Sequence, residues 1–489
     1  MALDNLADYF PDWKEREALA EDMIPLIGSL YRKNVVTYCY GRALYNQSVT
    51  QIMKTHRYVR QVAQNELSEF ESHPILNEMA KLNLGPSHID VGKLATKFMG
   101  ESESSVIDLA GFVKKECAAV VGIDALPLSE PQDVVLYGFG RIGRLLARLL
   151  IEKTGSGQQL RLRAIVVRKG GQDDLSKRAS LLRRDSVHGS FQGTLRVDEE
   201  NSCIIANGNV VRVLYANSPD ELNYENHEIK NAIVIDNTGV WRDSEGLAKH
   251  LACEGVAKVV LTAPGKGDIK NIVSGVNSHS IVSEDEIIAA ASCTTNAIVP
   301  PLKAMNDKFS IMSGHMETVH AYTPDQNLTD NYHKSNRRGR SAPLNMVITE
   351  TGASSAVTKL LPELEGKLTG NAIRVPTPNV SLAILNLTLG QETTVQEVND
   401  YLRESCIHGS MQRQMDFTYS PEVVSSDFVG NRHACIIDGE ATIVKDNRVV
   451  LYVWYDNEFG YSCQVVRVVQ KIAGITYPLI PEDVYKMGF

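Results

Sequence analysis

A strand followed by a glycine-rich turn and a helix constrains the fold of this 489-residue chain more than any other feature. The apolar run Val134 to Tyr137 precedes the turn Gly138-Phe-Gly140-Arg-Ile-Gly143, which leads into the helical pattern LLARLLIEK. The three glycines of such a turn allow a tight bend, a close backbone approach to a pyrophosphate and close packing of helix on strand. The motif alone is a weak signal, but this context favours an α/β dinucleotide-binding fold.

The second predicted strand, residues 160–167, bears on the choice of dinucleotide. In an NAD enzyme this strand normally ends in an acid that binds the ribose 2′-hydroxyl. Here Val167 is followed by Arg168 and Lys169, and there is no acid between Glu152 and Asp173. A carboxylate would repel a 2′-phosphate by about 4 kcal/mol at 4 Å and a dielectric near 20, so its absence removes the main barrier to NADP. Arg168 and Lys169 either bind this phosphate or form a solvated edge, and we expect NADP and/or NAD as cofactor.

The segment Ser292-Cys293-Thr294-Thr295-Asn296 contains the candidate nucleophile. The apolar run 287–291 predicts a buried strand and residues 297–302 a helix, so Cys293 is expected at a strand-to-helix turn. Backbone N–H groups and the helix dipole favour a thiolate there. Lowering a thiol pKa of about 8.5 by two units would make it mostly ionised at pH 7. A single cysteine is more often a small buried hydrophobe, so further motifs must decide.

The pentad resembles the active-site signature of the phosphorylating glyceraldehyde-3-phosphate dehydrogenases. The segment GFGRIGR also resembles the start of that family, and YDNEFGYS resembles its motif near the C-terminus, with Phe459 in place of Trp. The resemblance covers about three quarters of the chain, from residue 131 onward. It implies an α/β Rossmann-type dinucleotide-binding domain, an α+β catalytic domain and a homotetramer.

The resemblance also assigns the chemistry. It implies that Cys293 attacks glyceraldehyde 3-phosphate, that His320 in METVHAYT acts as general base, and that a thioester reacts with inorganic phosphate to give 1,3-bisphosphoglycerate. A single His in such a strand would otherwise be a core residue. The substrate or phosphate candidates are Ser292, Thr294, Thr323, Arg338, Arg340, Thr351, Gly352 and Arg374. The cofactor candidates are Gly138, Phe139, Gly140, Arg141, Ile142, Gly143, Arg168, Lys169, Asn237, Thr238, Gly239, Thr262, Asn457 and Tyr461.

Residues 1–130 lie outside the resemblance and are predicted to form an all-α extension. Ser48 and Gln51 form a candidate capping box, and Val106 to Val121 a last helix. No cluster of catalytic residue types occurs there. The expected domains are the extension 1–130, the dinucleotide-binding domain 131–292, the catalytic domain 293–455, and a returning helix with a tail, 456–489. The tail has no predicted function.

Two alternative functions remain open. An erythrose-4-phosphate dehydrogenase would share the Cys, His and phosphate logic, and an idle regulatory or scaffold paralogue would act through residues 1–130.

Composition limits the location and partners. The start MALDNLADYF lacks the basic and apolar parts of a signal peptide, and no apolar run approaches about 20 residues. The formal net charge is −9, which argues against nucleic acid as a partner. Eight cysteines without C-x-x-C pairs indicate a reducing cytoplasm and no metal site. We therefore expect a cytoplasmic enzyme that does not bind a membrane. If residues 1–130 have a partner outside this chain, we expect it to be another protein.

Overall fold

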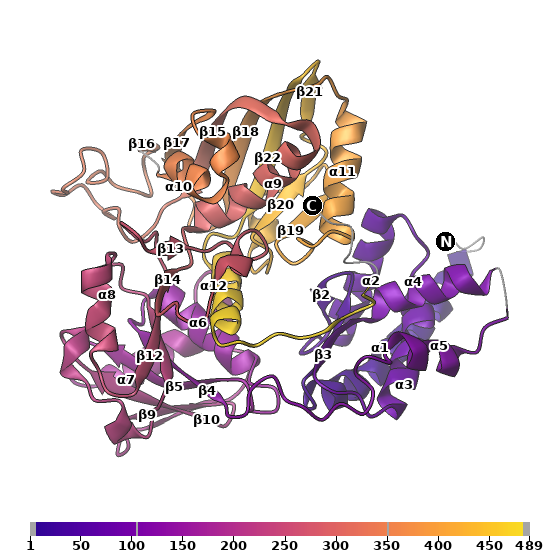
Figure 1. The fold of residues 1–489 in the computed structure, drawn as a ribbon, viewed down its shortest axis with the longest axis horizontal. Coiled ribbons are helices and arrows are strands. Elements are labelled where there is room, and N and C mark those ends of the chain that lie inside the picture. Colours follow the sequence, from indigo (N-terminus) through magenta and orange to yellow (C-terminus); the bar gives the residue numbers. More distant parts are fainter. Residues whose placement is uncertain (1–5, 104–105, 350–351, 483–489) are drawn as a thin grey trace.

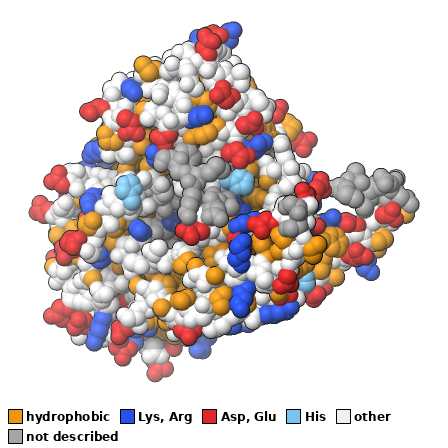
Figure 2. Space-filling model, turned by 45° about the vertical axis from the view of Figure 1, so that its right-hand side comes forward, with side chains coloured by type: hydrophobic (Ala, Val, Ile, Leu, Met, Phe, Trp, Pro, Cys, Tyr) orange, Lys and Arg blue, Asp and Glu red, His pale blue; other side chains and the backbone are white. Residues whose placement is uncertain are grey.

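A computed structural model of the chain describes residues 6–103, 106–349 and 352–482. Figure 1 shows three bodies: an N-terminal extension, a dinucleotide-binding domain and a catalytic domain, with helix α12 between the last two. The face shown in Figure 2 carries Lys, Arg, Asp and Glu side chains interspersed with apolar ones. No helix among the described residues is long and apolar enough to cross a membrane.

The dinucleotide-binding domain is built on a nine-stranded sheet. Its order is β13-β14-β12-β11-β4-β5-β10-β9-β8, and all neighbours from β13 to β10 run parallel. Six of these strands have the 3-2-1-4-5-6 order of a Rossmann fold, which confirms the predicted class. The strands are β4 (Gln132–Tyr137), β5 (Leu160–Val167), β8 (Leu195–Asp198), β9 (Cys203–Ala206), β10 (Asn209–Tyr215), β11 (Ala232–Asp236), β12 (Val256–Leu261), β13 (Lys270–Asn271) and β14 (Ile287–Ala289).

Helices cover this sheet because their apolar faces need burial. One buried cluster contains Leu146, Leu149 and Leu150 of α6 together with Val465 and Val469 of α12. The last long helix therefore packs on the dinucleotide-binding domain. The helices are α6 (Arg141–Glu152), α7 (Asp174–Arg183), α8 (Ser244–Leu251) and α12 (Phe459–Ile472), and a separate hairpin is formed by β6 (Arg184–Asp185) and β7 (Gly189–Ser190).

The catalytic domain has an eight-stranded mixed sheet of order β16-β17-β15-β18-β22-β20-β19, with β21 paired to β22. Its strands are β15 (Ile311–Ala321), β16 (Val347–Thr349), β17 (Leu368–Val375), β18 (Ser381–Leu389), β19 (Met415–Thr418), β20 (Cys435–Asp438), β21 (Ile443–Lys445) and β22 (Arg448–Tyr455). Its helices are α9 (Cys293–Phe309), α10 (Ala353–Leu360) and α11 (Val395–Ile407). Figure 1 shows them beside the sheet. This is the predicted α+β architecture.

The extension is mainly helical, and Ser48 with Gln51 forms the predicted capping box at α2. Its helices are α1 (Tyr9–Tyr31), α2 (Val49–Ala63), α3 (Glu69–Lys81), α4 (Val91–Ser102) and α5 (Leu109–Glu116). The extension is not all-α, however, because it also contains a sheet of order β2-β1-β3-β23. The strands β1 (Val35–Cys39), β2 (Arg42–Ala43) and β3 (Ser87–Asp90) are short. Such short strands lack a clear period-2 pattern, and the fourth strand comes from the other end of the chain.

That fourth strand is β23 (Leu479–Ile480), which belongs to the C-terminal tail. Leu479 pairs with His88 and Ile480 with Ile89, in parallel register. Figure 1 shows the yellow segment after α12 crossing from the core to the extension. The tail thus ties the extension to the rest of the chain, and one buried apolar cluster also runs from the extension into the catalytic domain.

Candidate active site

The turn that carries Cys293 is fixed by polar contacts on both sides. Cys293 is the first residue of α9, and Ser292 is its N-cap, with Oγ accepting from the Thr295 N–H at 2.9 Å. Ala291, with φ of 54°, lies in the left-handed region, and its carbonyl accepts from the Tyr461 hydroxyl at 2.9 Å. The predicted strand-to-helix turn is therefore present, and the Cys293 side chain lies at the N-terminal end of a 17-residue helix.

His320, near the end of β15, lies beside the sulfur. Its Nε2 is 3.5 Å from Cys293 Sγ, so the two residues predicted to react together are in contact. Its Nδ1 is 2.7 Å from the Ala321 carbonyl oxygen and 2.9 Å from Arg374 Nη1. A proton on Nδ1 donated to Ala321 leaves Nε2 free to accept the thiol proton.

The charge state of this pair differs from the sequence-based prediction. Burial raises the pKa of the Cys293 thiol, and this effect exceeds the opposing effects of Arg374 and of the Thr294 hydroxyl and N–H. Burial, together with the Arg374 charge, lowers the pKa of His320 to about 3. Both shifts oppose the predicted thiolate and favour a thiol beside a neutral imidazole, because burial outweighs the donors around the sulfur.

A pocket of about 360 Å³ opens in front of the sulfur. Arg338, Gly352 and Arg374 line it, as do Ser292 and Thr294. Lys359 on α10 and Asn271 on β13 also line it, and neither was expected from the sequence. Lys359 follows Gly352 by about two helical turns, a spacing that places both on the same face of α10 although they lie at opposite ends of it. The pocket thus combines a nucleophile, a base and several cations or hydroxyls.

The predicted phosphate ligands separate into three groups. Arg374 Nη1 lies 3.2 Å from Thr323 Oγ1, so these two meet as expected. Arg338 lines the pocket and is ion-paired with Asp325, which also accepts from Thr323. Arg340 is exposed, pairs with Asp330 at 2.9 Å and does not line the pocket. Thr351 lies outside the described residues. Of the two loop arginines, the structure therefore brings only Arg338 to the pocket.

A chain of hydroxyls fixes the floor of the pocket. The Tyr455 hydroxyl is 3.0 Å from Thr294 Oγ1 and 2.6 Å from Thr318 Oγ1. Thr294 and Thr318 are both buried, so this chain orders the turn and β15 relative to each other. Thr318 and His320 lie two residues apart in β15 and so point to the same face of the sheet, whereas Tyr455 is distant in sequence.

The glycine-rich turn forms the cradle expected for a dinucleotide. Gly138 has φ of 97°, and a Cβ on Gly143 would lie 2.4 Å from the Gly138 carbonyl oxygen. A Cβ on Gly140 would meet no atom within 4 Å. Gly140 thus leaves open space at the N-terminus of α6, where a pyrophosphate is favoured. A pocket of about 460 Å³ begins there, lined by Gly138, Phe139, Gly140, Thr238 and Arg168 among others.

Two arginines face this pocket at the end of β5. Arg168 and Arg178 line it, whereas Lys169 does not and lies 5.8 Å from the Tyr215 ring centroid. Arg178 donates to Asp174 and to the Arg168 carbonyl, so it orders the loop. Arg178 was not predicted to lie here, because it belongs to the next helix, α7. No acid lines the pocket among the described residues.

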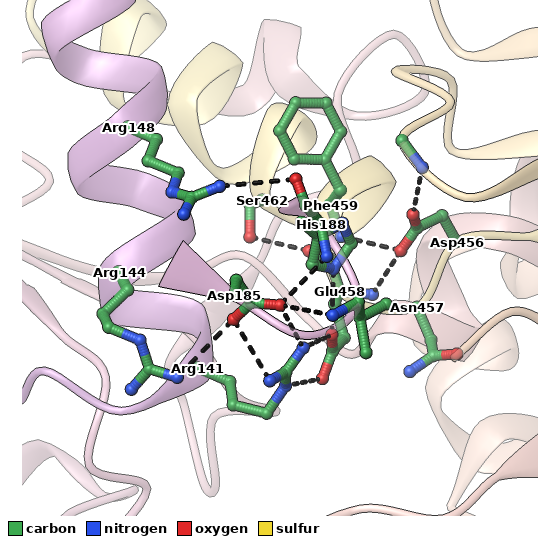
Figure 3. A network of polar contacts seen from close by, with 12 residues as sticks. Arg141, Arg144, Arg148, Asp185, His188, Asp456, Asn457, Glu458, Phe459 and Ser462 are labelled. Atoms are coloured by element: carbon green, nitrogen blue, oxygen red, sulfur yellow. Dashed lines mark hydrogen bonds and ion pairs between the residues drawn. The ribbon is translucent and has the colours of Figure 1, made fainter. Parts of the chain in front are cut away.

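Other cofactor candidates act on the protein scaffold. Arg141, assigned to the cofactor, instead binds Glu458 and Asp185, and His188 Nε2 lies 3.0 Å from the same Glu458 (Figure 3). This network joins the glycine turn to the segment containing Asn457. Burial is outweighed by Arg141 and His188, which hold the pKa of Glu458 below its usual value. Ile142 and Gly143 are helix residues of α6 and do not line the pocket.

Asn457 and its neighbours are held rigidly. The Asn457 Oδ1 accepts from the Ser381 hydroxyl at 2.9 Å, and Asn457 is buried. This contact leaves the amide nitrogen as the group available to a carboxamide. Tyr461, also a cofactor candidate, uses its hydroxyl on Ala291, so the structure gives it a positioning role for the catalytic turn instead.

The loops after β11 and β12 are organised by a buried carboxylate. Asp236 Oδ1 accepts from the Thr238 N–H and hydroxyl, each at 2.7 Å, and its Oδ2 lies 3.1 Å from His250. Asn237 and Thr262 bond to backbone carbonyls of β11. Gly239, with φ of 64°, continues the turn. Of these candidates, Thr238 reaches the lining of the dinucleotide pocket.

Comparison with known proteins links both domains to one family. Residues 132–244 match the model "Glyceraldehyde 3-phosphate dehydrogenase, NAD binding domain", and residues 292–457 match the C-terminal domain model of the same enzyme. A "Glyceraldehyde-3-phosphate dehydrogenase-like protein" of Pseudomonas aeruginosa is 62% identical over 94% of this chain and 100% of its own. "Glyceraldehyde-3-phosphate dehydrogenase 1" of Bacillus subtilis is 40% identical over 70% of this chain and 98% of its own. The second alignment leaves a part of this chain the size of the extension without a counterpart.

Proposed function

Because the chain belongs to the glyceraldehyde-3-phosphate dehydrogenase family, we propose that it oxidises and phosphorylates glyceraldehyde 3-phosphate to 1,3-bisphosphoglycerate, reversibly, with NAD or NADP. The observation that carries the proposal is the 3.5 Å contact between Cys293 Sγ and His320 Nε2 inside a pocket lined by Arg374 and Arg338. A nucleophile, a base and two guanidinium groups are what a phosphorylated aldehyde requires.

The first step joins the thiol to the aldehyde. The Cys293 sulfur forms a bond to the aldehyde carbon while its proton passes through His320 Nε2 to the carbonyl oxygen, which gives a thiohemiacetal. The Cys293 N–H at the start of α9 and the imidazole stabilise the developing oxyanion, an effect worth about 3–4 kcal/mol per donor in comparable sites. Since thiol and imidazole are both neutral, proton transfer accompanies the attack.

The second half of the reaction reuses the same base. His320 Nε2 accepts the hydroxyl proton of the thiohemiacetal as the carbonyl re-forms and a thioester on Cys293 remains. The bound nicotinamide supplies the hydride acceptor for this oxidation. Inorganic phosphate near Thr294 and Arg338 then attacks the thioester carbon, and the sulfur leaves and takes the proton back from His320.

Arg374 couples substrate binding to the base. Its charge lowers the pKa of His320, and its guanidinium also lies beside Thr323. A substrate phosphate bound by Arg374 and Thr323 neutralises part of this charge and so raises the pKa of His320. The base then becomes stronger once the phosphorylated substrate is in place.

The cofactor preference follows from the end of β5. With Arg168 and Arg178 lining the pocket and no acid among its described lining residues, we propose that the enzyme accepts NADP, alone or beside NAD. The ratio of kcat/KM for the two cofactors tests this, and a preference for NAD above a hundredfold would end it.

We also propose that the enzyme is a homotetramer. The loop between β15 and β16 projects from the body in Figure 1 and exposes Tyr332 by 90%, Leu344 by 81% and Met346 by 76%. Exposed apolar side chains gathered on one projecting loop indicate an interface. Light scattering should give a tetramer for the wild type and smaller species for a Tyr332→Ser, Leu344→Ser variant; a monomeric wild type would contradict this.

Steady-state assays with and without inorganic phosphate test the function. We expect phosphate-dependent reduction of NAD or NADP with glyceraldehyde 3-phosphate. Phosphate-independent oxidation of erythrose 4-phosphate to the acid would instead indicate an erythrose-4-phosphate dehydrogenase. No turnover of either aldehyde would indicate the idle paralogue acting through residues 1–130.

A further inference from the structure

A second cleft lies where the extension meets the dehydrogenase core, away from the catalytic pocket. Its volume is about 230 Å³. The extension contributes residues of β1, β2 and β3, and the core contributes the end of α6, the segments before β19 and β20, and α12. Its lining includes Tyr38 and His88 from the extension, and Lys153, Arg413, Arg467 and Gln470 from the core.

The lining is strongly cationic. Five of its side chains are Lys or Arg, and none is Asp or Glu. Arg42 is paired with Asp416 at 2.6 Å and Arg432 with Glu152 at 2.8 Å, and both acids lie behind the lining. In the part of the chain that the structure describes, no carboxylate lies within 4.0 Å of the three other cations, Lys153, Arg413 and Arg467.

These three cations rest on neutral groups. Lys153 Nζ is 3.4 Å from the Tyr45 hydroxyl, and Arg413 donates to His88 Nδ1. Arg467 donates to the Arg413 carbonyl and, at 2.9 Å, to Gln464 Oε1. Neutral acceptors orient a cation without neutralising it, so three positive charges face one small cleft.

Burial and mutual repulsion lower the pKa values of three basic groups in this cleft. Burial and the neighbouring Arg413 lower the pKa of Arg467 to about 10. Burial also lowers the pKa of Lys153, and burial with Arg413 holds the pKa of His88 well below its usual value. Half-buried cations that repel one another are costly to retain unless an anion completes the site.

We propose that this cleft binds a small phosphorylated anion, held by Lys153, Arg413 and Arg467. Guanidinium and ammonium groups together suit phosphate oxygens, which accept several charge-assisted hydrogen bonds. The volume of about 230 Å³ lies below the roughly 300–1,000 Å³ of drug-sized ligand sites, so the ligand is a small phosphate ester and not a dinucleotide.

The position of the site determines which parts of the molecule a bound ligand contacts. It bridges the extension to the core, because Tyr38 and His88 lie on one side and Arg413 and Arg467 on the other. It also contacts the C-terminal end of α6, at Lys153, and α12, at Arg467, whose N-terminal ends adjoin the glycine turn and Asn457. The inference does not depend on the proposed reaction, since it concerns binding alone.

Binding of inorganic phosphate and ribose 5-phosphate to the full-length protein, measured by calorimetry with NAD present, tests the site. An Arg338→Ala, Arg374→Ala background weakens phosphate binding in the catalytic pocket, so the remaining saturable site can be assigned. Citrate serves as a polycarboxylate of comparable charge. We expect ribose 5-phosphate to bind at one site, more tightly than citrate.

Three further substitutions in that background locate the site. Lys153→Gln should weaken binding about tenfold or more. Gln470→Glu places a carboxylate in the lining, so it should abolish binding and raise Tm in the absence of anions, which a folding defect would not do. Lys471→Gln, an exposed neighbour on α12, should change neither.

Three results would overturn the proposal. The first is the absence of saturable phosphate or ribose 5-phosphate binding, and the second is binding that is unchanged in both Lys153→Gln and Gln470→Glu. The third is tighter binding of citrate, which would overturn the phosphoryl assignment. Neither readout uses turnover, so failure here is distinct from failure of the dehydrogenase proposal.

Discussion

The catalytic pair and the contact between extension and core both bury ionisable groups, and they reach opposite charge states. At Cys293 and His320, burial raises the pKa of the thiol and lowers the pKa of the imidazole, so both are neutral. At Asp416, which is buried, Arg42 and other partners outweigh burial and hold the pKa of the carboxyl well below its usual value. Desolvation is common to both regions, and an opposite charge within bonding distance decides the outcome.

The two regions therefore have different roles, because the first serves catalysis and the second serves stability. The neutral pair costs the fold little and is free to move a proton, whereas the charged cluster around Asp416 fastens the extension. Asp416 accepts from Arg42 at 2.6 Å, from Asn431 at 3.1 Å and from the Tyr58 hydroxyl. Substitutions at the first region should therefore affect turnover, and those at the second should affect unfolding.

The largest effect is expected from Cys293→Ala. Removing the nucleophile should lower kcat by about 10⁴-fold or more, while cofactor affinity and Tm stay close to those of the wild type. Steady-state assays measure kcat, cofactor fluorescence measures the affinity, and thermal denaturation measures Tm. Cys203→Ala, on β9 outside the pocket, is the control, and it should retain turnover. Retained turnover in Cys293→Ala would remove this residue from the mechanism.

His320→Gln should lower kcat by about 10²–10⁴-fold, because the proton acceptor for the thiol is lost. With a pKa of about 3 in the free enzyme, the wild-type imidazole stays unprotonated at pH 5–7, so kcat/KM should change little with pH over this range. Alkylation of Cys293 by iodoacetamide should accelerate from pH 7 to pH 9, as expected of a thiol with a raised pKa. If the labelling rate were already at its maximum at pH 7, Cys293 would be a thiolate, as the sequence predicted.

Asp416→Asn tests the charged cluster that fastens the extension. Losing the buried carboxylate leaves the half-buried Arg42 without its partner, which should lower the free energy of unfolding by about 2–3 kcal/mol while kcat changes little. Chemical denaturation and limited proteolysis of the extension measure this. An unchanged unfolding midpoint would show that Asp416 does not fasten the extension.

The pH dependence of the same contact has a defined sign. Because the folded pKa of Asp416 is depressed, its stabilisation is fully present above the unfolded pKa of about 3.9 and is lost as pH falls through the folded value. Asp416→Asn should not show this loss of stability at acidic pH.

The smallest effect distinguishes the two loop arginines. Arg338→Gln should raise KM for inorganic phosphate about tenfold, because Arg338 lines the pocket. Arg340→Gln should leave KM and Tm unchanged, since Arg340 pairs with Asp330 at the surface. Equal effects of the two substitutions would contradict this placement.

The sequence predicted those parts of the molecule that depend on local spacing. The strand, glycines and helix around Gly140 and the turn at Cys293 are each encoded within a few neighbouring residues. The pairing of Cys293 with His320 came from the family resemblance, and the structure places the two in contact.

What the sequence could not predict depends on long-range packing. The sheet of the extension is completed by Leu479 and Ile480 from the other end of the chain. The Tyr461 hydroxyl reaches Ala291, and Arg141 reaches Glu458, through tertiary contacts that no motif records. The thiol pKa was mispredicted for the same reason, because burial of the sulfur is a property of the folded pocket.

The most direct test of the account is to trap the covalent intermediate. The enzyme is mixed with glyceraldehyde 3-phosphate and excess cofactor without inorganic phosphate, and the quenched protein is analysed by peptide mass spectrometry. The account predicts a burst of reduced cofactor equal to the number of active sites, with one acyl group on Cys293 that phosphate releases. A burst without an adduct on Cys293, or an adduct on another residue, would contradict it.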